Sequence, residues 1–299
     1  MENDPGQASG YIAHIDAVER QCSIDRPCRQ IWDKALKNDM QTGKSDAASG
    51  EFETKPGVKL PQTEDPRPKR FYKTVTVEAG EGGAWRVLLD GRGVKSPARK
   101  ELALPTKAAA EIIAAEWAAQ GEHIDAPTMP ASRLAFVTID RMAEARAETA
   151  AEVAKYASTD LLCFRAAEPA DLVLAQNAAW NPLLDWAASE LGVTLKAVAG
   201  IMPVEQDPVA LHTVLTRAGS LDDWKLTALA HTTAVCGSAV LGLALLERRI
   251  DGAQAHALST VDEVYQAAHW GADEDAAARN AILRAELVVV GNWLRALDA

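Results

Sequence analysis

The sequence predicts an α+β protein in which a small N-terminal antiparallel-sheet domain with helices is followed by an all-helical C-terminal domain. Extended segments with alternating apolar residues, separated by turn residues, occupy residues 72–91. Apolar residues at helical spacing recur from residue 106 to the end of the chain. The 299 residues, 48% of them hydrophobic, suffice for one large core or two modest ones.

We expect three parts along the chain: a disordered or loosely helical extension and linker over residues 1–68, the sheet-containing domain over 69–165 and the helical domain over 166–299. Residues 39–68 are rich in Gly, Ser, Thr, Pro and charge, and hold too little apolar surface to offset the entropy lost on ordering. Residues 11–37 are compatible with a lone helix, because apolar residues recur there at loosely helical spacing. These apolar residues are Ile12, Ile15, Val18, Ile31, Trp32 and Leu36.

The predicted sheet begins with alternation over residues 72–77 and continues with a second extended segment over residues 85–89. The cluster Gly80-Glu81-Gly82-Gly83 joins these two segments, so it predicts a hairpin turn rather than a phosphate loop, which requires a strand that feeds a helix. Asp90-Gly91 predicts a second tight turn, since this dipeptide accepts positive φ angles.

Two helices are expected in the second half of the sheet-containing domain. Thr106 is a candidate N-cap for the first, which ends by Gly121. Pro130 suits the first turn of the second, an alanine-rich helix from about residue 131 towards residue 156.

The helical domain contains several recognisable helix boundaries. Asn181-Pro182 predicts a kink or a restart capped by Asn181, because proline lacks an amide donor and clashes with the preceding turn. Gly192 ends that helix, and Asp207, Asp222 and Asp273 stand where later helices begin.

Two stretches of the helical domain have distinctive patterns. Residues 234–246 are apolar nearly all round, as expected of a helix at a domain's centre. Residues 251–270 read as one helix that stops at Gly271.

Composition argues against several classes of partner. A formal charge of −11 and a pI near 5.1 disfavour nucleic acid and anionic membrane surfaces. No apolar run approaches the roughly 20 residues that a membrane helix needs, so no membrane insertion is expected. The acidic, polar N-terminus resembles neither a signal peptide nor a transit peptide, which favours a cytoplasmic location.

No motif for catalysis, a cofactor or a metal is recognisable. H-E-x-x-H, G-x-S-x-G and Walker spacings are absent, and the six histidines never pair at helical spacing. Cys22 and Cys28 have the wrong spacing for a zinc knuckle with His14. Two alternatives stay open: a general protein-binding adaptor, or an enzyme with a dispersed active site. For the enzyme, the candidate pairs are Glu116 with His123 and Cys236 with His231.

One acidic cluster stands inside a predicted helix. Asp222-Asp223 and residues 273–275 lie where helices begin, and the macrodipole favours carboxylates there. Asp262 and Glu263 lie within the helix of residues 251–270, with Gln266 one turn further on and Trp270 one turn beyond. Alternatively, these acids lie on an ordinary solvent-exposed helix face and have no functional role. For the indoles, a core position is the more typical role; this group comprises Trp117, Trp180, Trp186 and Trp270.

Four phrases occur in the order typical of one known family: E-W-x-x-Q, T-D-L-L-C-F-R, W-N-P-L-L-x-W and D-E-x-Y-Q-x-x-x-W-G. With them, residues 69–297 resemble the mitochondrial and alphaproteobacterial assembly chaperones that bind the alpha subunit of the F-type ATP synthase catalytic sector. The chain departs from the family at Asn181, where Asp is frequent, and at Ala131 and Arg133, which replace more apolar residues.

The resemblance implies a chaperone, without catalysis or a cofactor, that holds unassembled alpha subunit and prevents its aggregation before the alpha/beta hexamer forms. We expect a monomer, in the cytoplasm of bacteria or the mitochondrial matrix of eukaryotic relatives. The family's strongest functional position falls on Glu263. Gln266 and Trp270 belong to the same block, and Asp262 adjoins it. These four residues form the predicted client-binding site, where the client is the protein that the chaperone holds.

Overall fold

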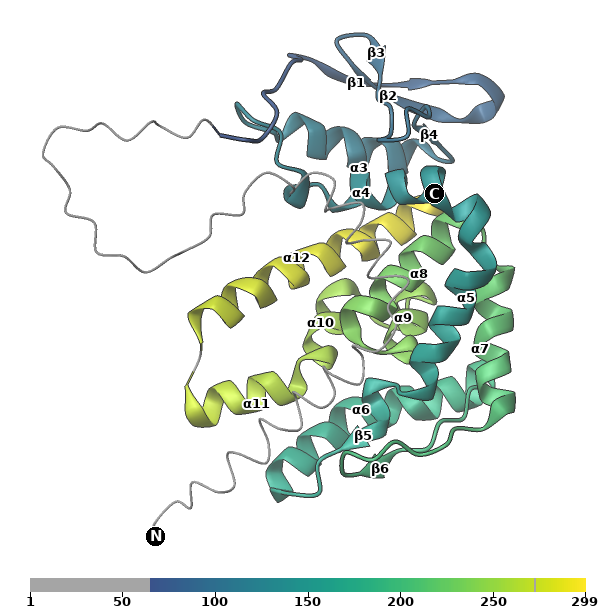
Figure 1. The fold of residues 1–299 in the computed structure, drawn as a ribbon, viewed down its shortest axis with the longest axis vertical. Coiled ribbons are helices and arrows are strands. Elements are labelled where there is room, and N and C mark those ends of the chain that lie inside the picture. The colour runs from purple at the N-terminus through teal and green to yellow at the C-terminus, as the bar shows by residue number, and fades with distance from the viewer. Residues whose placement is uncertain (1–64, 272) are drawn as a thin grey trace, which may run out of the picture.

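The computed structural model describes residues 65–271 and 273–299. The helix expected within residues 11–37, the linker over residues 39–64 and the pair Cys22 and Cys28 lie outside the described residues. The α+β fold class is confirmed, with a small antiparallel sheet followed by helices. Figure 1 shows the sheet at one end of the molecule and the helical part below it.

The sheet is a short meander built on one long hairpin. Strand β1 (Val75–Ala79) pairs antiparallel with β2 (Trp85–Leu89), from Val75 opposite Leu89 to Ala79 opposite Trp85. Strand β2 also pairs with β3 (Arg92–Gly93) and with β4 (Ala103–Leu104). The predicted turns are confirmed: Gly82 and Gly83 have φ of 66° and 81°, and Asp90 and Gly91 have φ of 48° and 79°.

Helix α3 (Lys107–Ala118) packs on the sheet and begins at the predicted cap. Thr106 Oγ1 accepts a hydrogen bond from the Ala109 amide at 3.1 Å. The same hydroxyl donates to the Ala296 carbonyl at 2.6 Å. One cap therefore ties the start of α3 to the last helix of the chain.

The expected long helix from residue 131 is interrupted by one wide turn. It consists of α4 (Pro130–Val137), a π-helical turn (Thr138–Met142) and α5 (Ala143–Ser158). Glu116 holds the start of α4, because its carboxylate accepts hydrogen bonds from the Ala131 and Ser132 amides at 2.7 and 2.8 Å.

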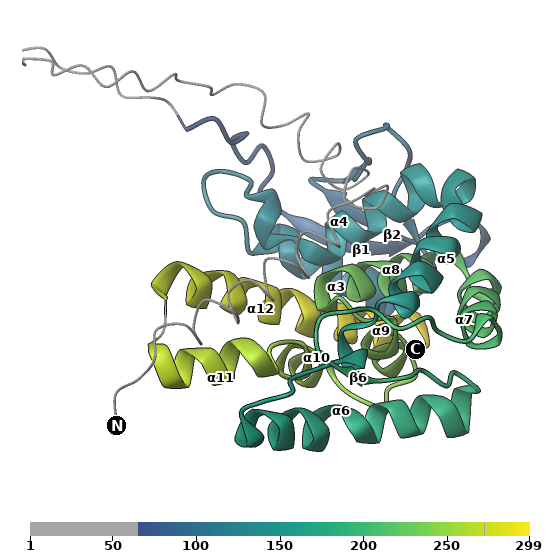
Figure 2. The same cartoon turned by 60° about the horizontal axis from the view of Figure 1, so that its bottom comes forward.

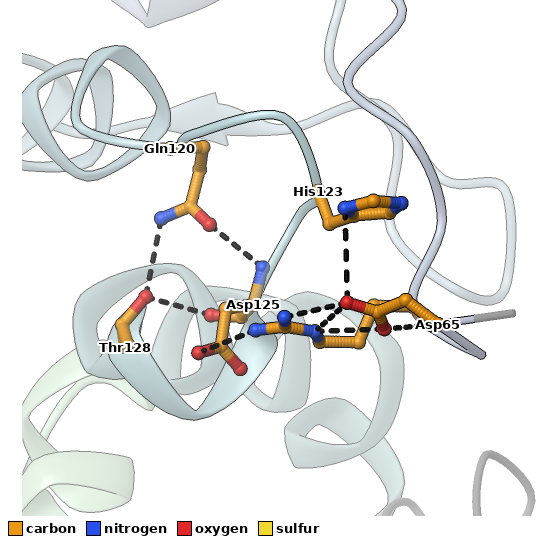
Figure 3. Close-up of polar contacts among 6 residues, drawn as sticks. Asp65, Gln120, His123, Asp125 and Thr128 are labelled. Atoms are coloured by element: carbon orange, nitrogen blue, oxygen red, sulfur yellow. Dashed lines mark hydrogen bonds and ion pairs between the residues drawn. The ribbon is translucent and has the colours of Figure 1, made fainter. Parts of the chain in front are cut away.

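The described chain enters the fold beside the end of α3, through the polar contacts drawn in Figure 3. Arg67 Nη2 lies 2.6 Å from Asp65 Oδ2, and Arg67 Nη1 lies 3.3 Å from Asp125 Oδ2. His123 Nδ1 lies 3.7 Å from Asp65 Oδ2. The bonds from Arg67 hold the pKa of Asp65 well below its usual range.

Seven helices and two short strands make up the helical part. They are β5 (Phe164–Arg165), α6 (Ala170–Leu191), β6 (Val198–Ala199), α7 (Pro208–Ser220), α8 (Asp223–Cys236), α9 (Ala239–Leu246), α10 (Gly252–Ser259), α11 (Val261–Trp270) and α12 (Glu274–Leu297). The parallel pair of β5 and β6 is an addition to the all-helical expectation.

The expected restart at Asn181 is wrong. Helix α6 passes through Pro182, so Asn181 is an interior residue rather than a cap. The missing amide of Pro182 deprives the carbonyl of Ala178 of its partner, and Ala178 is exposed, so water can replace that bond. The predicted end is confirmed, since Gly192 adopts a left-handed conformation with φ of 71°.

Two expected helices are each split in two. The apolar stretch of residues 234–246 breaks at Gly237, where φ is 65°, and Ser238 caps α9 by accepting from the Leu241 amide. The helix expected over residues 251–270 breaks at Thr260, which joins α10 to α11. In both cases a hydroxyl residue offers local hydrogen bonds that compete with a continuous helix.

Two hydrophobic cores are connected by α12. One core lies between the sheet, α3 and α4, and it includes Val290, Trp293 and Leu294 of α12. The other lies among α5 to α10 and includes Leu287. In contrast, residues 274–286 of α12, all described, include no buried side chain. Helix α12 is therefore anchored by its second half, while its first half extends away from the cores with α11 (Figure 2).

Within the described residues, no helix combines the length and the apolar content that spanning a bilayer would require.

Candidate functional site

Helix α11 lies against α6 through polar contacts on its inner side. Gln176 Nε2 donates to Asp262 Oδ1 at 2.7 Å. The Tyr265 hydroxyl donates to the carboxylate of Asp171 at 2.9 Å, and this bond lowers the pKa of Asp171. The contacts between α11 and α6 are thus polar, while Val261 at the start of α11 packs against the helical core.

The outward side of α11 carries apolar groups. At 100° per residue, Glu263, Val264, Ala267 and Trp270 share the side opposite the contacts with α6. Val264 is 62% exposed and Trp270 is 61% exposed. No side chain among the ten residues of α11 is buried. We call this side, defined by these four residues and Ala268, the outward face of α11.

Glu263 is exposed, and its Oε2 accepts a hydrogen bond from Asn280 Nδ2 of α12 at 2.9 Å. Our expectation that Asp262 and Glu263 lie inside a helix is wrong, because the break at Thr260 places both in the first turn of α11. The macrodipole favours carboxylates at this position. Its effect accounts for an acid here, but it does not require that the acid be exposed.

Gln266 is half-buried, and its Nε2 atom has no hydrogen-bond acceptor among the described residues. His256 of α10 lies nearby on the side towards α12. Burial lowers the pKa of His256, and the negative charge of Glu263 opposes that shift. The seam between α11 and α12 therefore contains polar groups that the fold satisfies only in part.

The four tryptophans divide between core and surface. Trp117 and Trp180 are buried, and Trp186 packs half-buried against the helical core, as expected. The core expectation is wrong for Trp270, whose indole is mostly exposed. Trp270 instead ends a row of rings on α11: Tyr265 stacks on His269 at 4.0 Å between centroids, and the His269 and Trp270 centroids are 5.9 Å apart.

Several residues around α11 were not identified from the sequence, namely Asp171, Val264, Tyr265, His269 and Asn280. The i, i+4 spacing of Tyr265 and His269 was a usable signal for a shared face. Asp171 and Asn280 gave none, because each lies on another helix and meets α11 only in the folded chain.

The two residue pairs of the enzyme alternative have other contacts. Glu116 caps α4, and His123 faces Asp65. His231 Nε2 lies 3.3 Å from Glu286 Oε1, and burial raises the pKa of the Cys236 thiol to about 12, which disfavours the reactive thiolate. In the part of the chain that the structure describes, no three His, Cys, Asp or Glu side chains form a group that could hold a metal ion.

The fold is that of an α+β protein with an exposed helix, α11, that presents apolar side chains and a carboxylate. Comparison with known proteins identifies the family to which this fold belongs. Residues 69–188 match the model of the family described as ATP12 chaperone protein. The mitochondrial protein atp12 of Schizosaccharomyces pombe is 27% identical over 237 residues, covering 75% of this chain and 80% of the relative.

Solved structures extend the likeness. Atp12 from Paracoccus denitrificans is 42% identical with a TM-score of 0.71, and the match covers 77% of this chain and 98% of that one. A single-residue mutant of the same protein matches equally well. A chaperone candidate from Agrobacterium tumefaciens is 33% identical with a TM-score of 0.73, covering 96% of this chain and 98% of that one. The chain belongs to the ATP12 chaperone family.

Proposed function

We propose that this chain is an assembly chaperone that binds the unassembled alpha subunit of the F-type ATP synthase catalytic sector. Binding prevents aggregation of the alpha subunit before it joins the beta subunit in the hexamer. The chain performs no catalysis and needs no cofactor. It acts in the cytoplasm, while the relative from Schizosaccharomyces pombe is mitochondrial.

The observation that carries the proposal is the exposure of two large apolar side chains on α11, a helix whose contacts with α6 are polar. Polar side chains face α6, while Val264 and Trp270 face outward with most of their surface in water. Leaving such side chains exposed forgoes about 1.5–3 kcal/mol each of burial free energy. A client that covers this face recovers that free energy. Burial of apolar surface can therefore drive client binding without a covalent step.

Four residues form the proposed client-binding site: Asp262, Glu263, Gln266 and Trp270. Trp270 supplies apolar area, and Glu263 supplies a carboxylate that can pair with a basic group of the client. The Gln266 side-chain amide, which has no acceptor among residues 65–271 and 273–299, can donate to the client. Asp262 supports the site indirectly, because its hydrogen bond with Gln176 holds α11 against α6.

The test is protection of purified alpha subunit from aggregation, followed by light scattering. We expect Glu263→Lys and Trp270→Ser each to lose most of the protection while the fold is kept. Glu148→Lys, which reverses an exposed carboxylate on α5, is the charge-matched control and should protect as well as wild type. Full protection by a correctly folded Glu263→Lys protein would refute the role assigned to this carboxylate.

The identity of the client requires a separate measurement. Affinity purification of the tagged full chain from its own cells should recover mainly one ATP synthase subunit. Recovery of many unrelated proteins in similar amounts would favour the general adaptor instead, and a measurable turnover in a hydrolase screen would favour the enzyme.

A further inference from the structure

The sheet end of the molecule concentrates positive charge. The whole chain has a formal charge of −11, yet residues 69–100 contain eight Lys and Arg and three Asp and Glu. Four of these cations lie within residues 92–100, between β2 and β4, and we call this segment the basic loop. The four are Arg92, Lys95, Arg99 and Lys100. In Figure 1 strand β3 lies at the top and α11 near the bottom, so the basic loop is remote from the outward face of α11.

The basic loop is fixed on the π-helical turn between α4 and α5. Asp140 of that turn accepts hydrogen bonds from the Ser96 hydroxyl and, at 3.0 Å, from the Ala98 amide. Lys100 Nζ donates to the Ile139 carbonyl at 2.9 Å. The fold therefore sets the position of the loop before any partner arrives, which lowers the entropic cost of binding.

Arg99 has a backbone conformation that an arginine disfavours. Its φ is 63°, in the left-handed region where glycine is the ordinary residue. Among the described residues, Asp90 and Arg248 are the other non-glycine residues with positive φ, and both use their side chains within the fold. Asp90 accepts from the Thr74 amide at 2.8 Å, and Arg248 pairs with Asp298. The Arg99 side chain has no such partner among the described residues, so nothing within them explains an arginine here.

Two further cations of the basic loop are also without a counter-charge. Arg92 and Lys95 are exposed, and neither forms an ion pair in the part of the chain that the structure describes. The acids nearby are engaged, because Glu101 pairs with Arg86 at 2.8 Å and Asp140 holds the turn. The basic loop thus presents three cations to solvent on a fixed backbone, and their charges complement an anionic partner.

The backbone of the basic loop narrows the kind of anion that fits. A compact phosphate site uses free backbone amides of a turn or a helix start. In the turn of residues 96–100 each amide already has an acceptor: Ser96 donates to the Lys100 carbonyl, Ala98 to Asp140, Arg99 to the Ser96 carbonyl and Lys100 to the Ser96 hydroxyl. Side chains alone remain for binding, and they are spread along the loop. Such an arrangement suits carboxylates spaced along a polypeptide, while the net charge of −11 repels nucleic acid.

We infer that the basic loop binds an acidic segment of the polypeptide that this chaperone holds, at a second contact separate from α11. The side chains of Arg92, Lys95 and Arg99 pair with carboxylates of that segment. Exposed charge pairs act mainly on the rate of association, so the basic loop captures the polypeptide and the apolar face of α11 retains it. That this polypeptide is the alpha subunit rests on the proposed function, whereas the preference of the loop for an acidic segment does not.

The first test measures the association rate of purified alpha subunit with the full chain. Lys95→Glu combined with Arg99→Glu should lower this rate about tenfold at about 50 mM salt and leave it near the wild-type rate at about 0.5 M salt. The matched control reverses Lys196 and Arg249, exposed cations of the helical part without an ion pair among the described residues. The control should stay within about twofold of wild type. Equal losses in both proteins, or no loss in the loop variant, would overturn the inference.

Arg99→Gly separates binding from folding. Glycine accepts the left-handed backbone, so this variant should be at least as stable as wild type in urea. It should nevertheless slow association about twofold, because it removes one of the four units of charge that the double reversal removes. Arg99→Lys keeps the charge and should keep the rate. Unchanged association in Arg99→Gly would overturn the role of Arg99, and a loss of stability would assign its side chain to the fold.

A titration without alpha subunit tests the basic loop by itself. A synthetic peptide of alternating Glu and Ala is added to the isotope-labelled full chain, and inorganic phosphate and a single-stranded RNA are added in parallel. We expect the peptide to shift the amide NMR signals of residues 92–100 more than those of Lys196 and Arg249, and the double loop variant to lose these shifts. An unshifted loop would overturn the inference, and larger shifts with phosphate or RNA would replace the polypeptide by that ligand. If wild type fails to bind alpha subunit while the peptide shifts persist, the proposed function is refuted and the preference of the loop stands.

Discussion

Gly252 lies so close to the backbone of Leu287 that a Cβ atom at position 252 would stand 2.0 Å from the Leu287 carbonyl oxygen. This contact joins the start of α10 to α12 at the residue where α12 first becomes buried. Gly291, one turn later, lies 3.2 Å from the Gly252 amide, measured from its own would-be Cβ. Gly252 and Gly291 thus allow α10 and α12 to cross closely, at the place where the exposed half of α12 ends and the buried half begins.

The first prediction concerns this crossing. Gly252→Ala should lower the free energy of unfolding by about 1–3 kcal/mol or more, because neither backbone can move away without opening the helical core. Gly219→Ala on α7, where nothing lies within 4 Å, is the control and should be neutral or stabilising. Urea unfolding followed by circular dichroism measures both. Equal midpoints for the two variants would show that the crossing is not tight.

The second prediction separates the two neighbouring acids of α11. Asp262→Ala removes the acceptor of the buried Gln176 Nε2 amide and should lower the free energy of unfolding by about 1–3 kcal/mol. Glu263→Ala removes an exposed bond to Asn280 and an exposed charge near His256, and it should stay within about 0.5 kcal/mol of wild type. Chemical unfolding gives the stability of each variant. An unstable Glu263→Ala protein would assign that carboxylate a structural role.

The third prediction concerns pH. Burial raises the pKa of Asp160 to about 6, above the ordinary value of 3.8, although the Leu162 and Val240 amides donate to its carboxylate. In this case the folded state binds the proton more tightly than the unfolded state. The contribution of Asp160 to stability is therefore full below about pH 4, falls as the pH rises to about 6 and is level above that, a change of roughly 3 kcal/mol at most.

The measurement is the difference in unfolding free energy between wild type and Asp160→Asn across pH 4 to 7. We expect the variant to be less stable overall, since an amide nitrogen would face an amide donor, and to lack this descending component. A constant difference across the range would contradict the raised pKa.

The fourth prediction concerns the hydroxyl of Thr106, which joins α3 to the end of α12. Thr106→Ala removes the cap and the bond to the Ala296 carbonyl and should cost about 1–2 kcal/mol. Thr106→Ser keeps the hydroxyl and should recover most of that loss. Thermal unfolding of both proteins tests this, and equal losses would point to the methyl group instead.

Much of the fold follows from local signals in the sequence. The turn glycines, the caps at Thr106, Asp207, Asp222 and Asp273, and the stop at Gly192 act within a few residues, so their effect is readable from the chain alone.

The errors arose where tertiary packing or side-chain hydroxyls determine helix boundaries and the exposure of side chains. Pro182 is tolerated because the carbonyl that it orphans faces water. Thr260 and Ser238 break stretches whose apolar pattern continues through them. At the candidate site, the positions of Glu263 and Trp270 in one block were predicted, but the exposure of Trp270 depends on which side of α11 rests on α6. The side of α11 that meets α6 bonds to Asp171 and Gln176, which are distant from α11 in sequence.

The sharing of α12 between the two cores has a consequence for synthesis. Val290, Trp293 and Leu294 complete the core beneath the sheet, although the sheet itself emerges from the ribosome almost two hundred residues earlier. The core beneath the sheet therefore cannot close until residues 290–294 have been synthesised. A chain that stops before α12 thus lacks part of both hydrophobic cores, and we expect it to stay incompletely folded.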